Sequence, residues 1–215
     1  MPVRKIPKNY RNVTGIAAQT KAIGEAQFES PLERDFIALL EFSPEVARYE
    51  VQPVKIEWKD AQGKPRYYRP DVRVEFCDEL KRPPWLYEVK CRDDLRAHWD
   101  ELRSKFRQGI RYARKQGWVF HLVSDVEIRT PYLTNVRFLL GYRNRTIPKA
   151  SIEAVLHASE RLGEASVEQL LQDLSDDPWQ QAEYLPAIWY LIANWRLHAD
   201  LQQTLTMASP IRRFA

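Results

Sequence analysis

Apolar residues at intervals of three and four predict a helix near the start of the chain. The positions that recur in this way are Leu32, Phe36, Leu39 and Leu40. This spacing places apolar side chains together, so we expect a helix with one buried face. The helix is expected to begin after Ser30, because Ser caps helices, Pro31 favours the first helical position and Glu33 completes a capping box.

The apolar spacing then changes to two, which is the period of a strand. Alternation predicts strands at residues 54–58, 67–76 and 85–91, and residues 60–63 (Asp-Ala-Gln-Gly) supply a turn between the first two. A nearly continuous apolar run at residues 118–123 predicts a fourth strand that is buried on both faces.

Two further helices complete the first part of the chain. One is predicted over residues 95–116, where Gly117 signals its end, and another over residues 131–142. The resulting order is helix, three strands, helix, strand, helix. This order indicates an α/β fold in which a mixed sheet is flanked by helices.

After residue 147 the pattern is helical again. Helices are predicted around residues 152–156, 166–174 and 184–193, and residues 196–207 can form two strands. Three helices and a hairpin in a segment of this length fit a winged helix. We therefore expect a small, mostly helical C-terminal domain.

The pattern and the distribution of charge divide the chain into three segments. Residues 1–24 contain five basic residues and no acid, and they form a basic arm that either follows phosphates or lacks a fixed structure. Residues 25–147 form the α/β domain. Residues 148–215 have five Lys or Arg against nine Asp or Glu, a net charge of −4. Because the whole chain carries +4, residues 1–147 carry a net charge of +8. A polyanion would therefore be attracted to the first part.

Composition excludes several classes of protein. The two cysteines, Cys77 and Cys91, form no CxxC pair, and the histidines have no ligand spacing, so we expect reduced thiols and no structural zinc. With only seven glycines, a nucleotide-binding loop is not expected. The sequence has no apolar leader and no apolar run of about 18 residues, so we expect a cytoplasmic protein without a membrane segment.

Two carboxylates and a lysine fall on or beside the predicted strands. Asp71 follows Pro70, and Glu88 and Lys90 share one face of the third strand, since alternate residues point to the same side. Carboxylate oxygens hold hard divalent cations, and such a cation polarises a phosphoryl oxygen and lowers the pKa of a bound water. A lysine can orient that water or stabilise charge on the phosphate. The set therefore indicates hydrolysis of a phosphodiester in DNA.

Each of these residues also has a simpler interpretation. Asp71 after Pro70 can be a turn residue, and Glu88 with Lys90 can be an exposed pair on a strand. Glu33 is explained by its place in the capping box, which the spacing favours, although a third carboxylate is chemically reasonable for a metal site. The set as a whole favours function, because strand ends are where sites form in open sheets.

The predicted helix that follows Lys90 is strongly basic. Residues 90–115 contain nine Lys or Arg and four acids. Four of these cations recur at three- and four-residue spacing on one helix face, namely Arg103, Arg107, Arg111 and Arg114. Such a stripe is either a solvated helix face or a track for the phosphates of DNA.

The Pro-Asp at residues 70–71 and the Glu-Val-Lys at residues 88–90 resemble the motif of the PD-(D/E)xK nuclease superfamily. More narrowly, residues 10–140 resemble TnsA, the endonuclease subunit of heteromeric cut-and-paste transposases. The segments that carry this likeness are residues 10–15, 28–34, 50–53 and 68–71.

The resemblance implies a restriction-endonuclease-like fold and the catalytic set Glu33, Asp71, Glu88 and Lys90. It implies Mg²⁺, for which Mn²⁺ can substitute, held by the three acids and by Val89. The implied activity is metal-dependent cleavage of the 5′, non-transferred strands of double-stranded DNA at transposon ends, inside a bacterial cell.

The resemblance also implies two protein partners. One is an integrase-like, TnsB-like transposase that cuts the other strand, and the other is an ATP-dependent, TnsC-like regulator. The acidic segment 148–215 would be the partner-binding domain. Two alternatives remain open: a stand-alone nuclease of DNA repair or restriction, and a nuclease fold retained only as a DNA-docking subunit. The intact Asp71, Glu88 and Lys90 set argues against the second.

Overall fold

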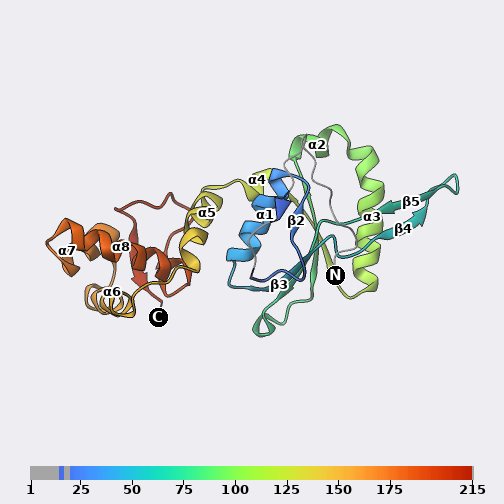
Figure 1. The fold of residues 1–215 in the computed structure, drawn as a ribbon. Coiled ribbons are helices and arrows are strands. Elements are labelled where there is room, and N and C mark those ends of the chain that lie inside the picture. The colour runs from blue at the N-terminus through green and yellow to red at the C-terminus, as the bar shows by residue number, and fades with distance from the viewer. Residues whose placement is uncertain (1–14, 17–19, 215) are drawn as a thin grey trace. The chain divides into compact units, whose positions relative to one another are not determined.

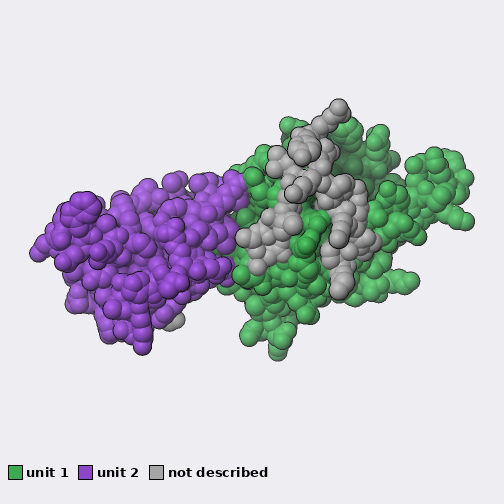
Figure 2. All heavy atoms as spheres, viewed as in Figure 1, with its two compact units in different colours: residues 1–129 green, residues 130–215 purple. Residues whose placement is uncertain are grey.

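The computed structural model describes residues 15–16 and 20–214. The chain divides into two compact units, residues 1–129 and residues 130–215 (Figure 2). Most of the predicted basic arm, residues 1–24, lies outside the described residues, so its role stays a prediction.

The division between the units falls earlier in the chain than the expected boundary after residue 147. Helix α5 (Pro131–Arg143) packs against helix α8 (Pro178–Ala193), and it therefore belongs to the second unit. The sequence pattern shows that α5 is a helix, but it does not show which core the helix joins.

A four-stranded mixed sheet forms the centre of the first unit (Figure 1). Its strands, in spatial order, are β3 (Val46–Val51), β6 (Val72–Phe76), β7 (Trp85–Lys90) and β8 (Val119–Ser124). The first two pairs are antiparallel and the β7–β8 pair is parallel. The predicted mixed sheet is confirmed.

The remaining elements of this unit are helices and short strand pairs. The helices are α1 (Pro31–Phe42), the 3-10 helix η1 (Asp78–Leu80), α2 (Arg92–Ala97), α3 (Trp99–Lys115) and α4 (Asp125–Ile128). The strand pairs are β1 (Gly15–Ile16) with β2 (Gln27–Phe28), and β4 (Ile56–Lys59) with β5 (Pro65–Tyr68). Of the helices described in either unit, none is long and apolar enough to cross a membrane.

Helices α1 and α3 cover opposite faces of the sheet (Figure 1), so the predicted flanking of the sheet by helices is confirmed. On one face Phe36 of α1 meets Tyr87 of β7, with ring centroids 4.9 Å apart. On the other face Phe106 of α3 meets Phe120 of β8. Phe120 pairs with Leu86, which points to the opposite side from its neighbour Tyr87. Aromatic contacts therefore fix α1 on β7, which carries Glu88 and Lys90, and α3 on the neighbouring strand β8.

Helix α1 begins where the sequence predicts. The Oγ atom of Ser30 accepts from the N–H of Glu33 (3.2 Å), and the Glu33 carboxylate accepts from the N–H of Glu29 (2.7 Å). Pro31 occupies the first helical position. Glu33 thus bonds the residue before the N-cap, whereas the predicted capping box would use the N–H of Ser30 itself.

Two strands are placed differently from the prediction. Residues 54–58 do not join the sheet, because β4 pairs with β5 in a separate two-stranded ribbon. Strand β3 forms one edge of the sheet instead. Its Glu50 is buried and forms an ion pair with Arg73 of β6 (3.2 Å). Because this buried residue is charged, apolar alternation does not reveal the strand. The predicted strand at residues 67–76 is interrupted by Pro70, which cannot donate to a ladder.

Strand β8 and the basic helix also differ from the prediction. Because β8 lies at an edge of the sheet, Val119 and Leu122 remain 40% and 39% exposed, and the predicted burial on both faces is wrong. The helix predicted over residues 95–116 is two helices, α2 and α3. The backbone of His98 between them leaves the helical conformation, at φ −122° and ψ 21°.

The second unit has the element order of a winged helix. After α5 follow α6 (Lys149–Leu162), β9 (Ala165–Ser166), α7 (Val167–Leu174), α8, β10 (Leu197–Ala199) and β11 (Pro210–Arg213). The strands form an antiparallel sheet in the order β10-β11-β9. The loop between β10 and β11 is the wing. The predicted small, mostly helical domain is confirmed.

A buried amide fixes the wing to helix α5. The Nδ2 atom of Asn135 donates to the carbonyls of Leu201 (2.9 Å) and Gln203 (2.7 Å). Its Oδ1 atom accepts from the N–H of Leu205 (3.1 Å). Because buried polar groups need such partners, Asn135 specifies the position of the loop, and this contact explains why α5 belongs to the second unit.

Helix α3 approaches the sheet and the ribbon closely at Gly109. A Cβ atom at this position would lie 2.6 Å from Cε2 of Phe120 and 3.1 Å from Cε1 of Tyr68. Gly109 lies within a helix, so its backbone conformation does not require glycine. The close packing against Phe120 and Tyr68 does.

We expect Gly109→Ala to destabilise the protein by about 1–3 kcal/mol, the usual effect of overpacking a core. Gly141→Ala is the matched control, because Gly141 also lies within a helix but no neighbouring atom lies within 4 Å of the added Cβ. There, alanine should stabilise by up to about 1 kcal/mol. Urea unfolding of the full chain measures both effects, and equal effects would contradict the close approach.

Candidate active site

Asp71 lies where the chain enters strand β6. Its N–H donates to the carbonyl of Tyr87 in β7 (3.0 Å), and its carbonyl accepts from the N–H of Gln52 (2.7 Å). Its Oδ2 atom accepts from the N–H of Val89, also in β7 (2.6 Å). Backbone contacts on both sides thus hold the carboxylate beside the end of β7.

Glu88 is buried on β7, with 1% of its surface exposed. Its Oε2 atom accepts from the hydroxyl of Tyr68 in β5 (2.6 Å), and its Oε1 atom accepts from Nζ of Lys105 in α3 (2.8 Å). The Nζ atom of Lys90 lies 4.0 Å from the same Oε1 atom. Because a buried carboxylate is costly without partners, the two hydrogen bonds and the nearby ammonium of Lys90 explain how β7 tolerates it.

The carboxylates at this site repel one another. Burial raises the pKa of Asp71 well above its usual range, and the negative charges of Glu88 and Glu33 raise it further. The N–H of Val89 and the ammonium of Lys90 act in the opposite direction on the pKa of Asp71. All four side chains predicted for the site therefore lie close enough to influence one titration.

Glu33 serves the start of helix α1 and also faces the site. Burial raises its pKa, the hydrogen bonds from Glu29 and Ser30 lower it, and the ammonium of Lys90 lowers it further. Its charge also contributes to the raised pKa of Asp71. The capping role and a role in the site are thus compatible.

The donor atoms at the site are of the kind that Mg²⁺ prefers, namely carboxylate and carbonyl oxygens. The N–H and the carbonyl of one strand residue point to the same side. The carbonyl of Val89 therefore faces the side on which its N–H meets Asp71. With Glu88 close by, a divalent cation would relieve the repulsion between the two carboxylates. The residues fit such an ion.

The site is not arranged as a closed metal cage. Within the described part of the chain, no group of three or more His, Cys, Asp or Glu side chains is placed so that it could hold a metal ion. Glu33 is engaged at the start of α1, and both oxygens of Glu88 are engaged by Tyr68 and Lys105. A metal at this site would therefore depend on two carboxylates and the carbonyl of Val89, with Glu33 in support.

Nothing in the spacing of the sequence singles out Tyr68 and Lys105. They come from β5 and α3, which only tertiary packing brings to Glu88. The available signal is Gly109, because a glycine inside a helix indicates a close approach, and Lys105 lies one turn before it on the same face. Burial and the charge of Glu88 raise the pKa of Tyr68, so its hydroxyl remains a donor.

The arginines that were predicted to share one face of the basic helix are exposed on α3: Arg103, Arg107, Arg111 and Arg114. A shallow pocket lies at the α2–α3 junction, lined by Arg92, Leu95, Arg96 and Trp99. The helix that supplies Lys105 to the buried site therefore presents cations to solvent.

The mixed sheet, with helices on both faces and acids gathered at its strand ends, defines a restriction-endonuclease-like fold. Residues 43–125 match the family of the TnsA-like endonuclease N terminal, and residues 127–201 match that of the TnsA endonuclease C terminal. The chain belongs to the TnsA-type endonucleases and is a nuclease subunit of a transposase, so the family predicted from the sequence is confirmed. No curated protein matches the chain.

We expect Asp71→Asn to stabilise the metal-free protein at neutral pH. The pKa of Asp71 is raised above its value in the unfolded chain, which is about 3.9. The folded state therefore binds the proton more tightly, and wild-type stability falls as the pH rises from the unfolded value through the folded one. Asn keeps an acceptor for the N–H of Val89 but removes the charge.

Thermal unfolding of both proteins from acidic to neutral pH measures this difference. The curves should converge at pH values below the unfolded pKa and separate as the pH rises, with the variant more stable. Glu79→Gln, at an exposed acid in η1, is the control and should follow the wild type. A variant that is less stable than the wild type at neutral pH would show that the Asp71 charge is stabilised in the fold.

Proposed function

We propose that this subunit is a metal-dependent endonuclease of the PD-(D/E)xK type, which cleaves the 5′ strands of double-stranded DNA at transposon ends. The observation that carries the proposal is the cluster at the ends of β6 and β7. It combines the repelling carboxylates of Asp71 and Glu88 with the ammonium groups of Lys90 and Lys105.

In this proposal Asp71, Glu88 and the carbonyl of Val89 hold Mg²⁺, for which Mn²⁺ can substitute, and Glu33 supports them. When bound, the ion supplies Lewis-acid activation of the phosphate and of the attacking water. Lys90 is half-buried at the rim of the cluster, where its ammonium can orient that water or stabilise charge on the phosphate.

Two further side chains position Glu88. Lys105 and Tyr68 each hold one of its oxygens, which leaves each oxygen with a second lone pair for an ion. The exposed arginines of α3 provide a track for DNA phosphates beside the site. Cleavage and DNA binding thus share one helix.

The second unit is better suited to bind protein than DNA. In a helix-turn-helix domain the recognition helix enters the major groove, yet α8 contains no Lys or Arg, and neither does the wing at residues 200–209. Trp179 at the start of α8 is 83% exposed. The unit as a whole has eight Lys or Arg against nine Asp or Glu. We infer that it docks on a TnsB-like transposase or a TnsC-like regulator.

A stand-alone nuclease of repair or restriction is the alternative function. The match to both TnsA families, one for each unit, favours a transposase subunit. The arrangement of Asp71, Glu88 and Lys90 likewise favours an active nuclease over a subunit that only docks on DNA.

Asp71→Asn should lower the rate of strand cleavage by at least about 100-fold, since even outer partners of metal ligands cause losses of this size. Lys90→Arg should also be impaired, because the broad guanidinium poorly replaces a compact ammonium. Cleavage of transposon-end DNA by the assembled transposase, with and without Mg²⁺, measures both effects. Glu79→Gln is the matched control. Wild-type rates in Asp71→Asn, or cleavage without a divalent cation, would overturn the proposal.

A chain that ends at Arg129 should retain weak, salt-sensitive DNA binding but lose its protein partners. DNA binding depends on Lys and Arg contacts with phosphates, which the first unit supplies. Circular dichroism checks that the truncated chain is folded. Gel-shift titration and co-purification with the transposase and the regulator then separate the two functions. Loss of DNA binding with partner binding retained would reverse the assigned roles.

A further inference from the structure

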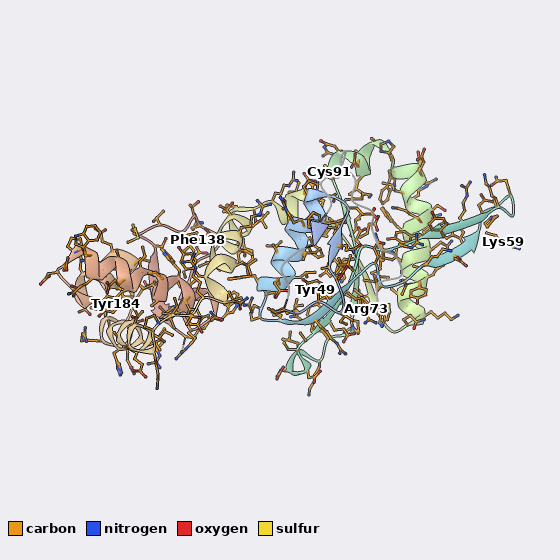
Figure 3. The ribbon with its side chains drawn as sticks, in the orientation of Figure 1. Tyr49, Lys59, Arg73, Cys91, Phe138 and Tyr184 are labelled. Carbon is orange, nitrogen blue, oxygen red and sulfur yellow. The ribbon has the colours of Figure 1, made fainter. Side chains whose placement is uncertain are left out.

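The ribbon formed by β4, β5 and their turn, residues 55–69, is distinct from the rest of the first unit. Its two strands pair with each other and not with the four-stranded sheet. In Figure 1 the ribbon projects beyond helix α3, and Figure 3 shows Lys59 near its outer end. A projecting two-stranded ribbon buries little surface of its own, so packing alone does not account for it.

The two faces of the ribbon differ. Ile56 and Tyr68 form a pair that is buried at its base, where α3 approaches. Tyr67, on the opposite face, is 63% exposed. Two cations lie over its ring, with Lys55 Nζ and Arg69 Cζ at 5.2 Å and 5.1 Å from the centroid. The outer face therefore presents an aromatic ring and cations to solvent.

The ribbon has an excess of positive charge, with five Lys or Arg against two acids. Both acids are engaged within the ribbon, since Glu57 forms an ion pair with Lys55, and Asp60 accepts from Arg66 (2.9 Å) and from the amides of its turn. The cations left without an ion pair to another described residue are Lys59, Lys64 and Arg69.

Arg69 combines this charge with an unused donor. Its Nε atom is buried and has no hydrogen-bond partner in the described part of the chain. A buried donor without a partner is uncommon in folded proteins. Arg69 also stands two residues before Asp71, so the positive charge of the ribbon extends toward the proposed metal site.

The ribbon is fixed to the site by short contacts. The hydroxyl of Tyr68 bonds Glu88 (2.6 Å), and the chain then passes through Arg69 and Pro70 to Asp71. A ligand held by the ribbon is therefore held at a defined position relative to the two carboxylates.

We propose that the ribbon enters the major groove of DNA beside the phosphate that is cleaved. A two-stranded ribbon fits the major groove. Lys59 and Lys64 contact the backbone at the groove walls, Tyr67 faces the base edges, and the positive charge of the half-buried Arg69 attracts a phosphate near Asp71. This inference rests on the proposed nuclease function and adds the element that sets the position of the cut.

The test compares two double variants of the full chain, each in the Asp71→Asn background. Lys59→Ala with Lys64→Ala changes the ribbon, and Lys81→Ala with Arg82→Ala removes the same charge from an exposed turn elsewhere. Fluorescence anisotropy with a short duplex of mixed sequence measures affinity across a salt series. Each lost phosphate contact lowers the magnitude of the slope of log K against log salt by about 0.9. The ribbon variant loses two such contacts, so its slope should fall by about 2, whereas the slope of the control variant should not change.

A second duplex tests the groove, because glucosylated 5-hydroxymethylcytosines fill the major groove with bulky groups. They should weaken binding of the Asp71→Asn parent more than binding of the ribbon variant. Equal slopes for the two double variants, or equal loss on the blocked duplex, would overturn the proposal. The proposed nuclease function has a separate readout, since wild-type protein with partner transposase and Mg²⁺ must cut transposon-end DNA. If the DNA is cut but the ribbon variant binds like the control, only the proposed role of the ribbon is overturned. If the DNA is not cut, the proposed nuclease function is overturned as well.

Discussion

The buried carboxylate of Glu88 is the constraint on which the first unit depends. A charge in this position is tolerated only when its oxygens are satisfied, and the two donors come from separate elements, Tyr68 of the ribbon and Lys105 of helix α3. Strand β7, the ribbon and α3 are therefore held in one arrangement. Gly109 permits it, because any side chain there would collide with Phe120.

The same constraint explains the electrostatics of the site. Glu88 keeps its place through Lys105 and Tyr68, and Asp71 keeps its place through the N–H of Val89 and the backbone of neighbouring strands. The fold thus holds two acids together against their repulsion, and burial, together with this repulsion, raises the pKa of Asp71. Sites in which pKa values are shifted in this way are often functional. A bound cation would reduce the repulsion between the two carboxylates.

Much of this could be predicted from the sequence, because it follows from local rules. The cap of α1, the shared face of Glu88 and Lys90 and the helical second unit all depend on neighbouring residues. The parts that could not be predicted depend on tertiary packing. Strand β3 buries the charged Glu50 and so lacks apolar alternation. The apolar run of β8 does not indicate that this strand lies at an edge of the sheet. Lys105 reaches Glu88 only once α3 has packed on the sheet.

The most direct test of whether this cluster is a metal site is anomalous scattering from a crystal of the protein soaked in Mn²⁺. An anomalous peak is expected in contact with the carboxylates of Asp71 and Glu88 and with the carbonyl of Val89, while Lys105 remains beside Glu88. A site with no peak, in a crystal where Mn²⁺ is bound elsewhere on the chain, would contradict it.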